Sequence, residues 1–168
     1  MSAEDLIEYW EENAAGKECW CVSAGGCTGS AFILRYGSKV QRKKTISNTM
    51  LSMDCRMFDS EFSLFVESAK WMLGTDHNGQ GDLIADSNDD CTPNGPMVQG
   101  LESLVGNTIS HATFNPVTCN LDVYFLENSV RLKVFGRIPR GSSGYSLYSP
   151  NYIVSIKEDQ QIEVFTRS

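Results

Sequence analysis

The feature that most constrains the fold is a pair of alternating segments in the second half of the chain. Residues 121–126, LDVYFL, and residues 130–136, VRLKVFG, are separated only by the polar segment ENS. In the second segment three aliphatic residues alternate with Arg131 and Lys133, which is the period of a β-strand. Such a pair predicts an antiparallel hairpin that packs one face on a core and exposes the other to water.

The rest of the chain adds strands and two helices. Ser2 and Asp5 have the spacing of a capping box, which predicts a helix that ends near Gly16. Gly37-Ser38 is a candidate hairpin turn. Strand-like patterns occupy residues 18–22, 30–36, 39–47, 61–73, 106–115, 145–149, 152–156 and 162–166, and residues 98–105 have helical spacing. We expect an α+β fold, mostly antiparallel β, as a sandwich or half-barrel with an N-terminal helix and one short central helix.

A chain of 168 residues has the length of one domain, so residues 1–168 are expected to fold together. The clearest internal boundary is residues 74–97, a segment rich in Asp, Asn, Gly and Pro. An alternative is therefore two β-lobes, 17–73 and 98–168, joined by this loop.

The sequence favours a cytoplasmic protein. No apolar run approaches the ~20 residues that span a membrane. The first residues are acidic and amphipathic, whereas a secretory signal has a basic start and an unbroken apolar core. Cysteines in the cytoplasm are normally reduced, so we expect free thiols. Because no apolar run is long enough to span a membrane, we also expect no membrane partner.

Charge is unevenly distributed along the chain. The net charge is −7, which disfavours nucleic acid as a direct partner, because phosphate contacts need Lys and Arg. Acidic residues crowd the first helix and the 74–97 loop, whereas residues 35–44 form a basic run with no acid. Solvated faces would account for these runs, and the alternative is an acidic patch that attracts a basic partner.

The segment ECWCVSAGGC, residues 18–27, raises the question of a metal site or a reactive thiol. In a regular strand Cys19 and Cys21 point to the same side. Zinc usually needs four ligands in paired turns, and no second close pair follows. Cys27, in a glycine loop, lacks a nearby base that would lower its pKa, although its thiol is a candidate for exposure. Buried, apolar cysteines are the simpler interpretation.

Two further kinds of site are disfavoured. Asp76, Asn78, Gln80 and Gly81 match the start of a calcium loop, but Ser87 stands where a bidentate Glu is required. Signatures such as G-x-S-x-G, H-E-x-x-H and the phosphate loop are absent. We therefore expect no catalytic residue, no metal and no cofactor, and an enzyme of another type remains the less favoured alternative.

One resemblance points to a function. Residues 100–135, GLESLVGNTISHATFNPVTCNLDVYFLENSVRLKVF, combine an L-x-G-x-x-I entry with the hairpin described above. Residues 63–73, SLFVESAKWML, form a second matching strand segment. These segments resemble small bacterial immunity proteins of polymorphic or contact-dependent growth inhibition toxin systems. The resemblance implies a non-enzymatic binding protein that neutralises a toxin, and it carries over no binding site.

An immunity protein that blocks the active site of a cognate toxin domain, expected to be a basic nuclease, fits the acidic charge. The candidate partner-binding residues are those of the first helix and the Asp-rich loop: Glu8, Glu11, Glu12, Asp76, Asp82, Asp86, Asp89 and Asp90. Exposed strand edges offer a second route, by β-augmentation. The alternative function is a metal- or small-ligand-binding β-rich module that uses the cysteines or the Asp-rich loop.

Overall fold

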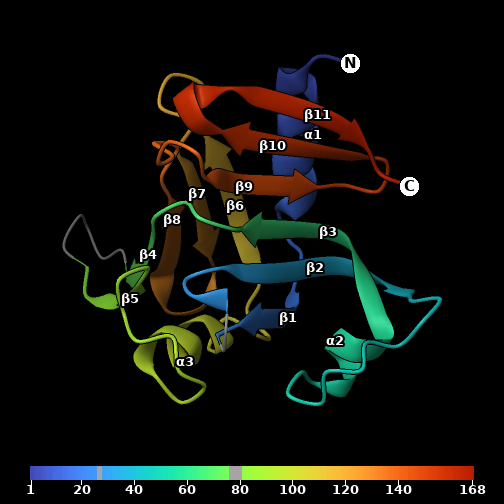
Figure 1. Ribbon diagram of the computed structural model, residues 1–168, viewed down its shortest axis with the longest axis vertical. Coiled ribbons are helices and arrows are strands. Elements are labelled where there is room, and N and C mark those ends of the chain that lie inside the picture. Colours follow the sequence, from blue (N-terminus) through green and yellow to red (C-terminus); the bar gives the residue numbers. More distant parts are fainter. Residues whose placement is uncertain (26–27, 76–80) are drawn as a thin grey trace.

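The computed structural model describes residues 1–25, 28–75 and 81–168, which form two antiparallel sheets and three α-helices (Figure 1). The first sheet has the order β1 (Cys19–Ala24), β2 (Phe32–Gln41), β3 (Phe58–Val66), β9 (Ser143–Tyr148), β10 (Tyr152–Lys157) and β11 (Ile162–Thr166). The second has the order β5 (Leu83–Asp86), β4 (Trp71–Thr75), β8 (Val130–Val134), β7 (Leu121–Phe125) and β6 (Ile109–Phe114). The predicted α+β fold of mostly antiparallel strands is confirmed.

The two sheets enclose one core. In Figure 1 the strands of the five-stranded sheet run steeply across those of the six-stranded sheet, and helix α1 (Ala3–Ala14) lies behind β9, β10 and β11. Buried side chains of both sheets and of α1 form a single hydrophobic cluster, which includes Trp10, Leu64, Leu132 and Leu147. Strands from residues 17–73 and from residues 98–168 share each sheet, so these two ranges do not correspond to separate sheets.

Helix α1 begins at the predicted capping box. The backbone N–H of Asp5 donates to Ser2 Oγ over 3.2 Å, and the N–H of Ser2 donates to the Asp5 carboxylate over 2.7 Å. The helix buries Leu6, Ile7 and Trp10 against the sheets. This amphipathic packing leaves its acidic face toward solvent.

The segment 61–73 is two strands rather than one. After β3 the backbone N–H groups of Glu67, Ser68 and Ala69 all point to the carbonyl oxygen of Gly144, at 3.0, 3.2 and 3.4 Å. The chain then enters the second sheet as β4, where Trp71 is buried and its Nε1–H donates to the Ser30 carbonyl over 2.9 Å. Strand periodicity continues on both sides of the turn, which is why the pattern alone suggested one strand.

The predicted hairpin turn at Gly37-Ser38 is wrong. Strand β2 runs through both residues, and its register against β3 shifts between Tyr36 and Lys39. Gly37 has a φ of +78°, so it supplies the backbone conformation of a β-bulge. The bulge lengthens β2 to Gln41 instead of reversing the chain.

The short helices differ from expectation in place and number. The predicted central helix is α3 (Pro96–Glu102), which begins two residues before the predicted range 98–105. A further helix, α2 (Met53–Met57), begins at Ser52, whose Oγ accepts from the Cys55 N–H over 3.2 Å. Within the described ranges no helix has the length and apolar character needed to cross a membrane.

Gly144 provides a test of the turn between the sheets. A Cβ at this position would overlap the Ile156 carbonyl oxygen and lie 2.7 Å from Ile138 Cδ1. We expect Gly144→Ala to lower the free energy of unfolding by about 2–4 kcal/mol, because the backbone of β9 must shift. The measurement is urea unfolding at equilibrium.

Gly141→Ala is the matched control. Gly141 has a φ of +77°, and no atom lies within 4 Å of the position that an added Cβ would occupy, so the substitution tests backbone conformation alone. It should cost about 1–2 kcal/mol. Equal losses in the two variants would contradict the packing role of Gly144.

Candidate functional site

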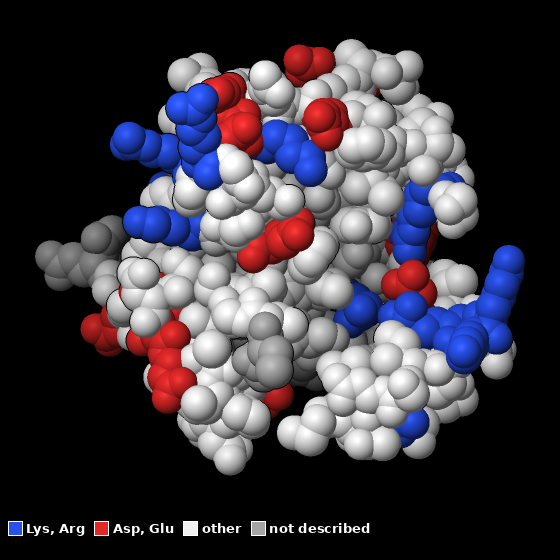
Figure 2. All heavy atoms as spheres, viewed as in Figure 1, with Lys and Arg blue, Asp and Glu red and all other residues white. Residues whose placement is uncertain are grey.

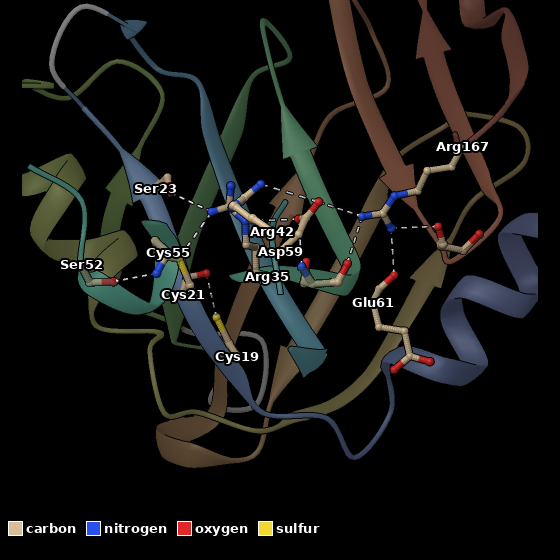
Figure 3. Close-up of polar contacts among 12 residues, drawn as sticks. Cys19, Cys21, Ser23, Arg35, Arg42, Ser52, Cys55, Asp59, Glu61 and Arg167 are labelled. Carbon is tan, nitrogen blue, oxygen red and sulfur yellow. Dashed lines mark hydrogen bonds and ion pairs between the residues drawn. A yellow bond between two sulfur atoms is a disulfide. The ribbon is translucent and has the colours of Figure 1, made fainter. Parts of the chain in front are cut away.

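A pocket of about 240 Å³ opens on the outer face of the six-stranded sheet. Three arginines converge on it from separate parts of the chain: Arg35 in β2, Arg42 just after β2, and Arg167 just after β11. Asp59, in β3, lies between them (Figure 3). This convergence of charged groups is the most developed polar site among the described residues that the structure presents in a cavity.

The alternation of the strands explains why Arg35 lies on this face. Phe32, Leu34 and Tyr36 of β2 are buried in the core, so Ile33 and Arg35 point to the other side of the sheet. The cross-strand partner of Arg35 is Ser63, and Ile33 is opposite Phe65. The next strand places Tyr148 beside Ser63. Half-buried Ile33, Phe65 and Tyr148 therefore form the apolar wall of the pocket.

Arg167 links the end of β11 to β3 through hydrogen bonds. Its Nη2 lies 3.1 Å from Asp59 Oδ2 and 3.1 Å from the Ser60 carbonyl oxygen. Its Nη1 donates to the carbonyl oxygens of Glu61 and Ser149, over 3.1 and 3.0 Å. These bonds tie the end of β11 to β3 and satisfy the charge of Asp59 at hydrogen-bond distance.

Arg35 and Arg42 are less well satisfied. Arg35 Nε lies 4.0 Å and Arg42 Nη1 lies 3.8 Å from the Asp59 carboxylate, which is too long for a hydrogen bond. Arg35 Nη1 does donate to Ser23 Oγ, over 2.8 Å. Arg42 Nε is buried without a hydrogen-bond partner among the described residues. Burial lowers the pKa of the Arg35 guanidinium and the charge of Arg42 lowers it further, while Asp59 opposes both effects.

A disulfide lies beside this pair. Cys21 in β1 is bonded to Cys55 in α2, with their Cα atoms 6.0 Å apart, and Arg35 Nη1 lies 3.4 Å from Cys21 Sγ. The expectation that these two cysteines are reduced is therefore wrong. No local spacing could have suggested the pair, because 34 residues separate its members. The bond anchors α2, and with it the segment after β2, to the edge of the sheet.

Cys19 and Cys21 do not point to the same side, contrary to the prediction. The register of β1 against β2 shifts between them, so Cys19 is opposite the inward-facing Tyr36 and Cys21 is opposite Arg35. The bulge adds one residue, and one residue reverses the side. Cys19 is fully buried in the core, where burial raises the pKa of its thiol to about 12.

The acidic residues predicted on the first helix are only partly available. Glu8 and Glu12 are exposed on α1. Glu11 instead accepts a hydrogen bond from the backbone N–H of Phe114, in β6. Burial raises the pKa of Glu11 in spite of this bond, because desolvation outweighs it. Glu11 therefore joins α1 to the second sheet.

The acidic residues of the predicted loop form turns. Asp86 accepts from the Asn88 N–H over 2.8 Å, Asp89 from the Asp86 N–H over 2.7 Å, and Asp90 from the Thr92 N–H over 3.0 Å. Asp82 is exposed next to β5. Asp76 lies outside the described residues, as do Cys27 and the Asn78 and Gln80 of the calcium-like segment.

The structure does not bring the two predicted acidic groups together. In Figure 1 α1 lies behind β9–β11, whereas residues 81–90, which include β5, lie at the left of the view, near α3. Figure 2 shows acidic side chains at the lower left, over this second region, and basic side chains at the right, beside the α2 segment. The predicted contacts are thus two patches and not one.

Sequence reasoning missed the arginine pocket. Its only local signals are the basic run of residues 35–44 and the outward position of Arg35 in β2. Asp59 and Arg167 are 108 residues apart, so their contact follows from the sheet order alone.

The arrangement has the features of a binding site for an anion. Within residues 1–25, 28–75 and 81–168, no group of three or more His, Cys, Asp and Glu is placed to hold a metal ion.

Comparison with protein-family models, curated proteins and solved structures gives no match to this chain.

The disulfide predicts a redox-dependent stability. Closing a loop of about 35 residues stabilises a fold by about 3–4 kcal/mol, through the entropy of the unfolded chain. We expect a reducing agent to lower the free energy of unfolding by that amount in urea titrations. The double variant Cys21→Ser, Cys55→Ser should show no response to the reducing agent. An unchanged transition of the unsubstituted protein under reduction would contradict the bond.

Thiol labelling predicts a second pattern. Cys91 is half-buried in a loop, whereas Cys19 and Cys119 are buried and burial raises the pKa of both thiols. At pH 8, iodoacetamide should modify Cys91 in the folded protein and reach Cys19 and Cys119 only after denaturation. Peptide mapping by mass spectrometry gives each rate separately, including that of Cys27, which we expect to exceed the rate of Cys19. Labelling of Cys19 as fast as that of Cys91 would contradict the burial.

Proposed function

We propose that the chain is a non-catalytic immunity protein, which neutralises a basic toxin domain by binding over its active site. The observation that carries the proposal is the solvent face of α1. Glu4, Asp5, Glu8 and Glu12 are exposed on it, and the helix contains no Lys or Arg. A face of one sign with no internal counter-charge suits a partner of the opposite sign.

The ion pairs of the described residues support this view. They join Arg35, Arg42 and Arg167 to Asp59, and three further pairs join Lys39 to Asp54, Arg131 to Asp122 and Lys157 to Glu163. None of them uses an acidic residue of α1. The exposed carboxylates of Glu4, Glu8 and Glu12 therefore remain available to attract an incoming cationic surface.

Exposed apolar side chains of β11 provide the second requirement of a tight complex. Helix α1 packs against β9, β10 and β11, and β11 is the edge strand of its sheet. Val164, on the face of β11 that turns toward the core and α1, is 43% exposed, and Phe165, on the opposite face with Tyr148, is 47% exposed. Tight interfaces place apolar or aromatic residues at the centre and charges at the rim. The free edge of β11 also allows a partner strand to pair with it.

A nuclease is the favoured target class. Domains that act on nucleic acid carry basic surfaces around the active site, because they must bind phosphates. The acidic face of α1 would compete for that surface. Steered association can reach ~10⁸–10⁹ M⁻¹s⁻¹ at low salt, which lets an inhibitor act before its target reaches nucleic acid.

Two matched variants test which acidic patch acts. The triple variant Glu4→Gln, Glu8→Gln, Glu12→Gln removes three charges from α1. The triple variant Asp86→Asn, Asp89→Asn, Asp90→Asn removes three from the other patch and keeps the side-chain oxygens that accept the turn hydrogen bonds. The proposed function predicts that the partner is a toxin domain encoded immediately upstream, and stopped-flow mixing with that domain over a range of salt concentrations gives the association rate.

We expect the α1 variant to associate at least about tenfold more slowly at low salt, with a weaker dependence on salt. The Asp86, Asp89 and Asp90 variant should change the rate less, because that patch lies away from β11. The reverse order would move the contact to the Asp-rich loop. Failure of the well-folded protein to bind the domain or to rescue cells that express it would overturn the immunity function.

A further inference from the structure

The guanidinium groups of Arg35 and Arg42 share the sheet-face pocket without a counter-charge of their own. We propose that this pocket binds a phosphate monoester with a small planar or apolar body, in addition to the partner binding proposed for α1. The two sites are on opposite sides of the six-stranded sheet, since α1 packs on the face that carries Tyr36 and the pocket opens on the face of Arg35.

The balance of charge points to a dianion. Three arginines and one aspartate leave a formal charge of +2 in the pocket. Arg167 is the arginine within hydrogen-bond distance of Asp59, at 3.1 Å. Arg35 and Arg42 thus supply the excess charge. A phosphate monoester carries a charge close to −2 at neutral pH, whereas a carboxylate carries −1.

The unused donors point to the same class of ligand. A guanidinium has five N–H groups, and these match the oxygens of phosphate in pairs. Arg42 Nε is buried and has no hydrogen-bond partner within the described part of the chain, and the Arg42 side chain is 18% exposed. A buried donor without an acceptor destabilises the fold. An oxyanion in the pocket would satisfy it.

The wall of the pocket sets the size and shape of the remaining part. Ile33, Phe65 and Tyr148 give one apolar side, and the guanidinium of Arg167 lies 5.8 Å from the centre of the Tyr148 ring. The volume of about 240 Å³ is below the ~300–1,000 Å³ of ordinary ligand sites, which suits a single ring rather than a dinucleotide. Ser63 on the floor offers a hydroxyl for a ligand oxygen.

Asp59 limits the choice of ligand. Its carboxylate repels an anion and attracts a cation, but three arginines within 4.0 Å exclude a metal ion by charge. Arg167 and the backbone hold Asp59 in place, so the anion would bind on the side of Arg35 and Arg42. Ligands with one negative charge should therefore bind more weakly than dianions.

Isothermal titration calorimetry at pH 7.5 tests the proposal with phenyl phosphate as the probe. Inorganic phosphate and benzoate are the comparison ligands. We expect saturable binding of phenyl phosphate, at least fivefold weaker binding of inorganic phosphate for lack of the ring, and at least tenfold weaker binding of benzoate. Absence of saturable binding of phenyl phosphate, or benzoate binding as tightly, would overturn the proposal.

Arg42→Gln is the decisive variant, because the Arg42 side chain makes no hydrogen bond that the described fold requires. The substitution should weaken the binding of phenyl phosphate at least tenfold, with little change in the temperature of thermal unfolding. Arg140→Gln, at an exposed arginine between β8 and β9, makes the same charge change away from the pocket and should alter affinity less than twofold. Equal affinity in Arg42→Gln and the unsubstituted protein would overturn the assignment.

A second variant and a peptide ligand complete the test. Arg42→Lys keeps the charge and loses the paired donors, so it should bind with intermediate affinity and serves if the Gln variant fails to fold. A phosphotyrosyl peptide that binds more than tenfold tighter than phenyl phosphate would overturn a small-molecule ligand in favour of a protein. Toxin binding by the Arg42→Gln variant should be unchanged, so failure of one proposal is distinguishable from failure of the other.

Discussion

One carbonyl oxygen, that of Gly144, holds the turn on which both sheets depend. It receives the backbone N–H groups of Glu67, Ser68 and Ala69, and it thereby takes the chain out of β3 and into β4. The turn forces successive strands of one segment into different sheets, which cross steeply around a shared core. Helix α1 and the five-stranded sheet together cover one side of the six-stranded sheet. The opposite side of β2, β3 and β9 is left to form the pocket.

The two sides of this sheet carry opposite charges for separate physical reasons. Glu4, Glu8 and Glu12 need no partner, because they face water on a helix that is anchored by Leu6, Ile7 and Trp10. The arginines of the pocket are instead held by the sheet, by the disulfide next to Arg35, and by the bonds of Arg167 to β3. A chain of net charge −7 can therefore keep a cationic pocket, since net charge describes the whole surface and not a site.

Sequence patterns located most of the elements but not the pairing of strands that are distant in the chain. The capping box at Ser2 and the alternation in β7 and β8 depend on neighbours a few residues away, and both predictions are confirmed. The Gly37 bulge, the split of residues 61–73 and the reversed sides of Cys19 and Cys21 depend on register with distant strands. Register is set by the whole sheet, so a local period cannot reveal it. The pocket was missed for the same reason, because Asp59 and Arg167 meet only through the order β3-β9-β10-β11.

Arg42 Nε is one of four buried side-chain polar atoms without a hydrogen-bond partner among the described residues, and it is the one that belongs to a residue lining the pocket. Natural folds keep buried donors paired, and exceptions concentrate where a ligand or a partner completes the set. Arg42 could reach solvent by a different rotamer if nothing favoured its present position, since its neighbours Lys43 and Lys44 are exposed. It instead turns toward Asp59, beside Arg35, where mutual repulsion opposes it. The fold therefore holds two like charges together in advance of binding, and pre-organisation of this kind strengthens the binding of an anion by removing the cost of assembling its site.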